Sequence, residues 1–384
     1  MKLVIDENIS FAEEAFESFG EIILLNGRKI DNKILSDADA LIVRSITNVN
    51  EKLLKNTNVK FVGTATIGTD HIDLDYLSEN KIEFSSAAGC NSYAVTEYVF
   101  CAIANIITQN HILKENPSIG IFGFGNIGTK ISRYAKAMGL DVFISDPPLE
   151  RAGNPQVFHS PEKVLESDII TFHVPLNTEG IDKTVHLLDE NKLEKIKPGT
   201  IIINSSRGPV IDNAALLRRL KKNKDIFAVL DVWENEPDFM LELLQNINLG
   251  TPHIAGYSLE GKVNGTKMIY DALCKFLSRE PVWQPVLPNV DNSVVELKNE
   301  QNNFEILSSI FENVYSIKED DLLLRNSLNM SDNQKKEYFD ILRKNYKYRR
   351  ELNNYKIKID SGQPENLNLT GLNWISEFRL NLVS

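Results

Sequence analysis

The chain is poor in cysteine, with only Cys90, Cys101 and Cys274 among its 384 residues. These three form no C-x-x-C pair and no spacing typical of metal ligands. The pattern excludes a disulfide-stapled secreted domain, and we expect no metal site. A sparse, odd number of cysteines is typical of a reducing compartment, so we expect a cytoplasmic protein.

The sequence also lacks long apolar runs and an excess of basic over acidic residues. No stretch of about 18 apolar residues is present, which a transmembrane helix would need. The N-terminal apolar residues are broken by Asp6 and Glu7, unlike a signal peptide. The 42 Lys and Arg are outnumbered by 53 Asp and Glu, giving a net charge of −11. We therefore expect neither nucleic acid nor a membrane as partner, because phosphate binding needs a basic face.

A glycine-rich turn is the most informative local feature. It follows a short apolar run, 118–122, and opens a segment with apolar residues at helical spacing. A second apolar run, 142–144, ends just before Asp146. This order of strand, glycine turn, helix, strand and acid is typical of a dinucleotide site. The expected cofactor contacts are Gly123, Gly125, Asn126, Ile127, Gly128 and Asp146.

The acid decides which dinucleotide is expected. A carboxylate at Asp146 would accept hydrogen bonds from the adenosine ribose and repel a 2′-phosphate. Pro147 and Pro148 follow it, where an NADP site would offer an arginine. The sequence therefore favours NAD over NADP, with an ordinary α/β glycine turn as the weaker alternative.

Short apolar runs alternate with helical patterns over most of the chain, which indicates parallel sheets. A helix is expected over 92–108 as a linker between domains, and another over 261–277 that returns to the first domain. We predict an α/β fold with two doubly wound, Rossmann-like domains. The expected buried strands are 3–5, 22–25, 41–43, 61–62, 169–172, 200–203 and 227–230.

Beyond about Pro288 asparagine and charged residues become more frequent. Phe304, Leu307, Phe311 and Val314 nevertheless keep helical spacing, and residues 355–359 alternate like a strand. We predict a small C-terminal α+β domain rather than a disordered tail. Its short length suggests that it packs on something larger, such as a partner subunit.

Three polar segments follow later strands and carry Arg207, Glu236 and His253. Catalytic groups gather at the carboxyl ends of strands in such sheets. Residues 90–260 resemble the D-2-hydroxyacid dehydrogenases, in which the matching Arg, Glu and His are catalytic. The resemblance implies that Arg207 holds a substrate carboxylate, His253 is the general base, and Glu236 orients the imidazole ring.

Nearly the whole chain resembles one branch of that family, the erythronate-4-phosphate dehydrogenases. The similar segments are 6–8, 43–45, 61–66, 68–71, 253–257 and 342–351. The resemblance implies NAD-dependent oxidation of 4-phospho-D-erythronate to (R)-3-hydroxy-2-oxo-4-phosphooxybutanoate, toward pyridoxal 5′-phosphate (vitamin B6). It also implies a homodimer and three domains. These are a discontinuous substrate-binding domain (1–92 and 258–288), an NAD-binding domain (93–257) and a C-terminal dimerisation domain (289–384).

Further site residues are implied by the same resemblance. Around the cofactor they are His173, Ser206, Asp231 and Gly256. Around the phosphorylated hydroxy acid they are Arg44, Ser45, Thr66 and Tyr257, with Arg349 and Arg350 as candidates that could reach a neighbouring subunit's cleft.

Several alternatives stay open at this point. Glu234 competes with Glu236, and His71, His111, His159, His173 and His186 compete with His253. The substrate could be a different acid, as in D-3-phosphoglycerate dehydrogenase. The chain could also be a non-catalytic, NAD-sensing scaffold, although a scaffold has no need of the Arg, Glu and His set.

Overall fold

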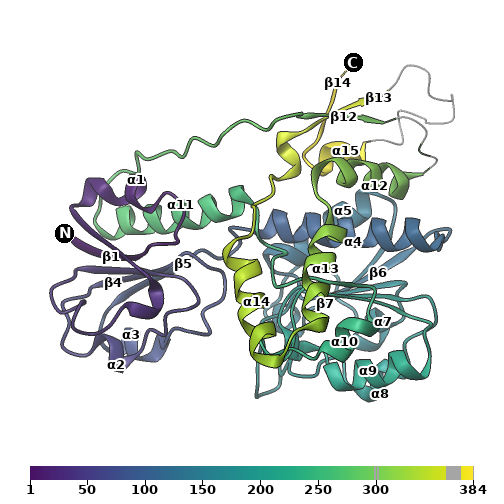
Figure 1. The fold of residues 1–384 in the computed structure, drawn as a ribbon, viewed down its shortest axis with the longest axis horizontal. Coiled ribbons are helices and arrows are strands. Elements are labelled where there is room, and N and C mark those ends of the chain that lie inside the picture. The colour runs from purple at the N-terminus through teal and green to yellow at the C-terminus, as the bar shows by residue number, and fades with distance from the viewer. Residues whose placement is uncertain (298–299, 301, 360–372, 384) are drawn as a thin grey trace. The chain divides into compact units, whose positions relative to one another are not determined.

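The computed structural model describes residues 1–297, 300, 302–359 and 373–383 (Figure 1). Parts of the predicted C-terminal domain, at 298–299, 301, 360–372 and 384, lie outside the described residues. The chain divides into two compact units. Unit 1 comprises Met1–Asn91 and Ser258–Pro288, and unit 2 comprises Ser92–Tyr257 and Asn289–Ser384.

Unit 1 is a five-stranded parallel sheet in the order β2-β1-β3-β4-β5. Leu3 and Ile5 face the layer of α1 and α11, whereas Val4 faces the layer of α2 and α3 (Figure 1). The elements are β1 (Lys2–Asp6), α1 (Ala12–Phe16), β2 (Glu21–Leu25), β3 (Ala40–Val43), α2 (Glu51–Leu54), β4 (Phe61–Thr64), α3 (Leu74–Glu79), β5 (Glu83–Ser86) and α11 (Leu259–Phe276).

The larger sheet of unit 2 has six parallel strands in the order β11-β10-β9-β8-β6-β7. Chain order reverses between β6 and β8, which is the switch point where such sheets bind ligands. Its strands are β6 (Ser118–Phe122), β7 (Asp141–Ser145), β8 (Ile169–Phe172), β9 (Ile201–Asn204), β10 (Phe227–Leu230) and β11 (Leu249–Gly250).

Helices cover both faces of this sheet, and two apolar clusters fill the layers. Ile119 and Ile121 pack toward α4 and α5, while Phe122 and Ile170 pack toward α7 and α9. The helices are α4 (Ser92–Asn110), α5 (Asn126–Ala137), α6 (Pro147–Arg151), α7 (Pro161–Leu165), α8 (Glu190–Leu193), α9 (Asn213–Lys222) and α10 (Leu241–Asn246).

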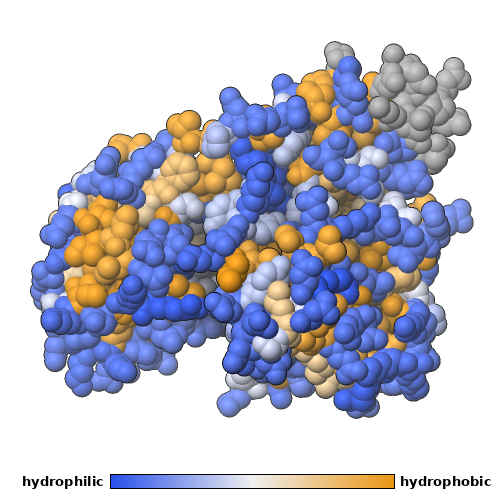
Figure 2. Space-filling view, viewed as in Figure 1, coloured by the Kyte–Doolittle hydropathy of each residue, from blue (hydrophilic) through white to orange (hydrophobic). Residues whose placement is uncertain are grey.

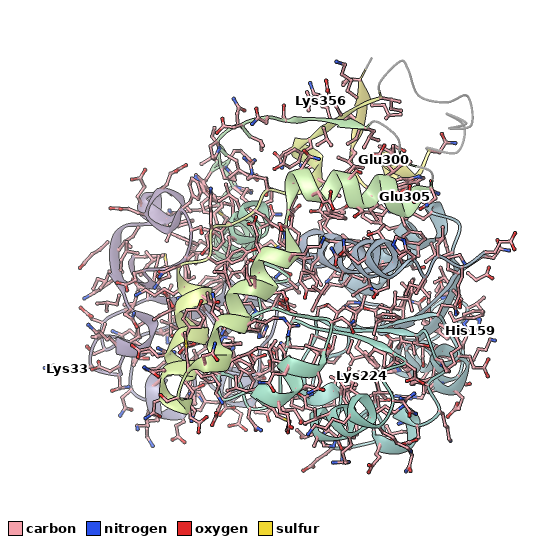
Figure 3. All side chains as sticks on the ribbon, turned by 45° about the vertical axis from the view of Figure 1, so that its right-hand side comes forward. Lys33, His159, Lys224, Glu300, Glu305 and Lys356 are labelled. Carbon is pink, nitrogen blue, oxygen red and sulfur yellow. The ribbon has the colours of Figure 1, made fainter. Side chains whose placement is uncertain are left out.

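The described residues from 289 onward in unit 2 form a three-stranded parallel sheet and the helices α12 to α15. Lys356, labelled in Figure 3, is an exposed residue of its central strand. The elements are β12 (Val294–Leu297), α12 (Asn303–Val314), α13 (Ile317–Arg325), α14 (Asp332–Lys344), β13 (Lys356–Ile359), α15 (Trp374–Glu377) and β14 (Asn381–Val383). Short 3-10 helices are η1 (Glu17–Phe19), η2 (Gly27–Lys29), η3 (Gly208–Val210), η4 (Asn326–Asn329) and η5 (Leu352–Asn354).

This C-terminal part shares its core with the large sheet. Phe378 packs on Phe100 of α4 at 5.0 Å and on Tyr134 of α5 at 4.1 Å, measured between ring centroids. Helix α12 also lies against α4. Consequently α4 is buried on nearly all sides, rather than on the single face that its spacing predicts.

The predicted α/β class with Rossmann-like parallel sheets is confirmed, and a third small sheet is present at the C-terminal end. Helix α4 begins at the boundary between the units and belongs to unit 2, and α11 returns to unit 1 as expected. No helix among the described residues is long and apolar enough to span a bilayer. Figure 2 shows polar residues over much of the visible face, with apolar side chains over α13 and α14.

Candidate active site

The predicted catalytic and cofactor residues of unit 2 all follow the carboxyl ends of parallel strands. Adjacent strands β9, β10 and β11 lead to Arg207, Glu236 and His253 respectively. The glycine turn follows β6, Asp146 follows β7, and His173 follows β8. Because parallel strands end at one edge of the sheet, the fold gathers these side chains there.

Glu236 and His253 are in direct contact. Nδ1 of His253 lies 2.8 Å from Oε2 of Glu236, and the other carboxylate oxygen accepts the backbone N–H of Trp233 at 2.7 Å. Burial opposes ionisation of Glu236, but the charge and hydrogen bond of His253 outweigh it, so the pKa of this carboxyl is lowered. Glu236 is therefore a fixed carboxylate that holds the Nδ1 edge of the imidazole ring.

Trp233 joins the three strand-end loops. Its indole N–H donates to the carbonyl of Thr251 at 3.0 Å, next to the His253 loop. A Cβ at Gly208 would overlap its backbone carbonyl, so Gly208 permits the Arg207 loop to lie against it. Neither relationship can be read from local spacing, which gives Trp233 no role.

Asp231, at the end of β10, is buried and shapes the His253 loop. Its Oδ1 accepts the backbone N–H of Ile254 at 2.7 Å and the hydroxyl of Thr251 at 2.6 Å. Its Oδ2 accepts the N–H of Ala255 at 2.9 Å. His253 itself has φ of 58°, a left-handed conformation that these bonds support. The proposed contact of Asp231 and Gly256 with the nicotinamide stays a prediction.

Arg207 sits in a turn organised by Asn204. The Asn204 side-chain N–H donates to the carbonyl of Arg207 at 2.9 Å, and its oxygen accepts the N–H and hydroxyl of Ser206. One guanidinium nitrogen of Arg207 donates to the carbonyl of Ser206 at 2.8 Å. The predicted site residues Arg207 and Ser206 thus belong to one ordered turn.

The glycine turn fits a dinucleotide phosphate. Gly123 and Gly128 are closed in, since a Cβ on either would strike backbone, His173 in one case and Gly123 in the other. Gly125 is exposed, and no described atom lies within 4 Å of its Cβ position. A phosphate could approach there, at the N-terminal end of the 12-residue helix α5 that includes Asn126 and Ile127.

Asp146 stabilises the glycine turn through a hydrogen bond. One carboxylate oxygen accepts the N–H of Phe124 at 2.7 Å, and the other caps α6 by accepting the N–H of Leu149 at 3.1 Å. Each oxygen retains a lone pair for a ribose hydroxyl. Across the switch point, the Nε2 of His173 bonds to the Thr171 hydroxyl at 2.8 Å, and burial lowers the pKa of His173 to about 3.

The predicted substrate residues of unit 1 also follow strand ends. Arg44, after β3, pairs with Asp6 at the end of β1, with Nε 3.2 Å from Oδ2. Thr66, after β4, bonds to the Thr64 hydroxyl at 2.8 Å, and Ser45 is exposed. Strands β1 and β3 flank the reversal of this sheet, so the pair occupies its switch point.

Tyr257 and the C-terminal part meet within unit 2. The Tyr257 ring packs on Tyr346 at 5.6 Å and on Tyr348 at 6.1 Å between centroids. Arg343, near the end of α14, faces Tyr257 and the charge of Glu236. Burial works against its charged form, but Tyr257 and Glu236 outweigh this, so its pKa is raised. Local sequence pattern does not indicate this position of Arg343 beside Glu236.

The two candidate tail arginines have partners in the same chain. Arg349 is 8% exposed and its guanidinium donates to backbone carbonyls, including that of Ile254 at 3.2 Å. Arg350 donates to the Asn354 side chain at 2.8 Å. A reach of either arginine into a neighbouring cleft stays a prediction.

Three of the competing residues, Glu234, His186 and His159, have other partners. Glu234 bonds to His186 at 2.7 Å and accepts the N–H of Asn213. Together with Asp212, which caps α9, they bring possible metal-ligand atoms within 4.8 Å of one another. His159, labelled in Figure 3, accepts the Ile144 N–H at 3.4 Å and packs on Phe143.

Comparison with known proteins places these features in a family. Residues 108–255 match the family described as D-isomer specific 2-hydroxyacid dehydrogenase, NAD binding domain. Residues 286–371 match a domain of unknown function (DUF3410).

Full-length relatives are more specific. An erythronate-4-phosphate dehydrogenase from Proteus mirabilis is 42% identical over 377 residues, spanning 97% of this chain and 99% of that relative. One from Yersinia pestis is 41% identical over 363 residues, spanning 94% of this chain and 95% of that relative.

Solved structures agree on the fold. A formate dehydrogenase from Staphylococcus aureus in complex with NAD aligns with a TM-score of 0.58 at 25% identity, over 74% of this chain and 97% of its own. An NAD-bound 3-phosphoglycerate dehydrogenase from Entamoeba histolytica aligns with a TM-score of 0.60 at 24% identity, over 72% and 95%. The cofactor is NAD, as the glycine turn and Asp146 predict, and the chain belongs to the erythronate-4-phosphate dehydrogenase family of the D-isomer specific 2-hydroxyacid dehydrogenases.

Proposed function

We propose that the chain oxidises 4-phospho-D-erythronate to (R)-3-hydroxy-2-oxo-4-phosphooxybutanoate with NAD, in the biosynthesis of pyridoxal 5′-phosphate. The printed names of relatives at about 42% identity over nearly the whole chain support this substrate. The observation that carries the chemistry is the 2.8 Å contact between Glu236 and His253, on the sheet edge where the glycine turn lies.

His253 is proposed as the general base. Its Nδ1 is engaged by Glu236, and in the described part of the chain Nε2 makes no hydrogen bond. Nε2 would accept the proton of the C2 hydroxyl during oxidation and return it during reduction. Glu236 fixes the ring orientation and stabilises the imidazolium that forms, which is the role of the acid in a hydrolase triad.

Arg207 is proposed to hold the substrate carboxylate. A guanidinium offers a planar fork for bidentate pairing, and its charge polarises the adjacent C2 oxygen. When bound, NAD supplies the nicotinamide that accepts the hydride from C2. The α5 N-terminus and Gly125 would receive the pyrophosphate, and Asp146 the ribose, which leaves Arg207 and His253 to act on the hydroxy acid.

Unit 1 is proposed to recognise the phosphate through Arg44, Ser45 and Thr66. Arg44 carries a positive charge that its buried partner Asp6 orients, and the two hydroxyls can donate to phosphate oxygens. Tyr257 of unit 2 is proposed as a further substrate contact. These assignments make residues 1–92 and 258–288 the substrate-binding domain and residues 93–257 the NAD-binding domain.

A homodimer formed through residues 289–384 and a cytoplasmic location are further parts of the proposal. Leu322, Leu323 and Ile341 on α13 and α14 are exposed apolar side chains, which can serve in subunit contact (Figure 2). Cys90, Cys101 and Cys274 are free cysteines, and such sparse, unpaired thiols support the proposal of a reducing compartment. Sedimentation of wild type and of the Leu322→Glu variant tests the dimer, and a monomeric wild type contradicts it.

The test is NADH formation with 4-phospho-D-erythronate, 3-phosphoglycerate and D-lactate compared side by side, each against a blank without enzyme. Turnover of the first alone, lost in His253→Ala and retained in the matched variant His159→Ala, supports the proposal. Preference for another acid would retain the oxidoreductase and reject the phosphate assignment. Bound NAD with no turnover on any acid would favour the scaffold alternative.

A further inference from the structure

The loop that carries His253 is held on both edges of its backbone. On one edge, Asp231 accepts the N–H groups of Ile254 and Ala255. On the other edge, Arg349 donates to the carbonyl oxygens of the same two residues, to Ile254 at 3.2 Å and to Ala255 by a short contact. The backbone N–H and C=O groups of the two residues directly after His253 are therefore all held, by a carboxylate on one side and a guanidinium on the other.

Arg349 comes from the C-terminal part, between α14 and η5. The same guanidinium donates to the carbonyl of Ala94 on α4 at 3.0 Å, and it lies 4.3 Å from the Tyr315 ring centroid. Three carbonyls and an aromatic face thus surround a cation that is 8% exposed. Both terminal nitrogens are engaged, by these carbonyls and by the Tyr346 hydroxyl at 3.4 Å, whereas the buried Nε has no partner among the described residues. Because these bonds offset part of the cost of burying the charge, the arrangement specifies where the guanidinium lies.

The segment that presents Arg349 is itself anchored. Next in the chain, Glu351 pairs with Arg379 at 2.7 Å, and Arg379 also pairs with Glu97 of α4 at 2.9 Å. The Leu352 N–H donates to the same Glu97 carboxylate at 3.1 Å. These contacts fix the segment of Arg349 to α4, and Arg349 in turn connects that segment to the loop of His253.

We infer that Arg349 is a positioning residue that sets the backbone geometry of the His253 loop, so that the C-terminal part contributes to catalysis within its own subunit. This inference rests on the proposed role of His253 as general base. Arginine suits the task because its planar fork reaches several carbonyls at once, whereas a lysine ammonium is a point donor.

The test compares Arg349→Met and Arg349→Lys with Arg325→Met. Arg325 is the matched control, since it lies on α13 and donates to the carbonyls of Leu244 and Ile247, outside the loop of residues 251–257. With 4-phospho-D-erythronate and NAD, Arg349→Met should lower kcat by about 10- to 100-fold with little change in KM, because a displaced base costs rate. Arg349→Lys should be intermediate, and Arg325→Met should keep kcat within about 2-fold.

A second readout needs no substrate. Amide hydrogen exchange of peptides covering 251–257 should accelerate in Arg349→Met and Arg349→Lys but not in Arg325→Met. If the folded Arg349→Met variant shows unchanged exchange over 251–257 and the same kcat as Arg325→Met, the inference is overturned. If wild type lacks activity but exchange responds as stated, the loop-positioning role stands and the proposed reaction fails.

Discussion

The carboxylate of Glu236 lies 2.8 Å from Nδ1 of His253, and its second oxygen is tied to the backbone of Trp233. Glu236 is therefore both a partner of the imidazole and a fixed point of its own loop. Because its pKa is lowered, the Glu236 carboxyl is ionised at neutral pH and stays ionised to a lower pH than an ordinary glutamate. Orientation and charge are separable, because a glutamine keeps the shape and loses the charge.

Replacing Glu236 by Gln should lower kcat by about 10²-fold or more, since the imidazolium formed in oxidation loses its counter-charge. Substrate KM should change little, because Glu236 is not proposed to contact substrate. Steady-state kinetics with Glu234→Gln as control separate the two acids, since Glu234 bonds to His186 instead. A larger loss of kcat in the Glu234 variant would reverse the assignment.

The glycine turn allows a sharper separation of folding from binding. A Cβ at Gly128 would overlap the carbonyl of Gly123, so Gly128→Ala should destabilise the fold by about 1–3 kcal/mol. Gly125→Ala should leave Tm nearly unchanged, because its Cβ position is open, yet raise the Kd for NAD at least about 10-fold. Thermal melts and NADH fluorescence titrations measure both. Equal Kd values for Gly125→Ala and wild type would remove the phosphate from this turn.

Asp146 is expected to select NAD. Asp146→Ser should weaken NAD binding by about 10-fold and reduce the preference over NADP, since the ribose loses its acceptor and the 2′-phosphate its repulsion. Ser is chosen because it can still cap α6, where Asp146 accepts the Leu149 N–H. Titrations with both cofactors give the ratio, and an unchanged ratio would assign selectivity to another residue.

Much of this architecture follows from local pattern. Apolar runs of strand length and helical spacing place β1, β3, β6 and β8 and the helices between them, because burial depends on periodicity. The glycine turn with Asp146 predicts the cofactor site from a short stretch of chain. Arg207, Glu236 and His253 are predicted as catalytic because they follow strand ends and because of the resemblance to the D-2-hydroxyacid dehydrogenases.

What local pattern misses is contact between distant segments. Arg349 meets Ile254 and Ala94 only after the chain folds, and an exposed basic pair is the ordinary reading of Arg349 and Arg350 in a helical stretch. The burial of α4 on all sides has the same origin, since α12 comes some 200 residues later in the chain. Neither contact changes the spacing of apolar residues near it.

Arg44 offers a test of the phosphate assignment. Asp6 is fully buried and pairs with it, so Arg44→Met leaves a buried carboxylate without its cation and should destabilise unit 1 by roughly 3 kcal/mol or more. Arg44→Lys should retain the charge but raise KM for 4-phospho-D-erythronate at least about 10-fold, because the bidentate fork is lost.

The control for Arg44 is the substrate itself. If the guanidinium binds phosphate, D-lactate or another unphosphorylated acid should show the same KM in Arg44→Lys as in wild type. Equal rises for phosphorylated and unphosphorylated acids would indicate that Arg44 holds the fold or the carboxylate instead.

The buried pair of Glu97 and Glu351 shares one cation, Arg379. Burial and then the charge of Glu351 raise the pKa of Glu97 to about 8, against the opposing effects of Arg379 and the Leu352 N–H. In an unfolded chain the value is near 4.5. Between these two values the folded state holds more protons than the unfolded state, so the free energy of unfolding should fall as pH rises through this window.

Glu97→Gln should therefore match wild type in Tm near pH 5, where Glu97 is neutral, and exceed it by at least about 3 °C near pH 8.5. Gln keeps an oxygen for the Leu352 N–H, and Arg379 keeps Glu351, so no new buried charge appears. Glu377→Gln is the control, since Glu377 forms an exposed pair with Arg133 in the same unit and should show no such pH-dependent gain. A Tm difference that is equal at both pH values would mean that Glu97 is ionised throughout, with Arg379 compensating both carboxylates.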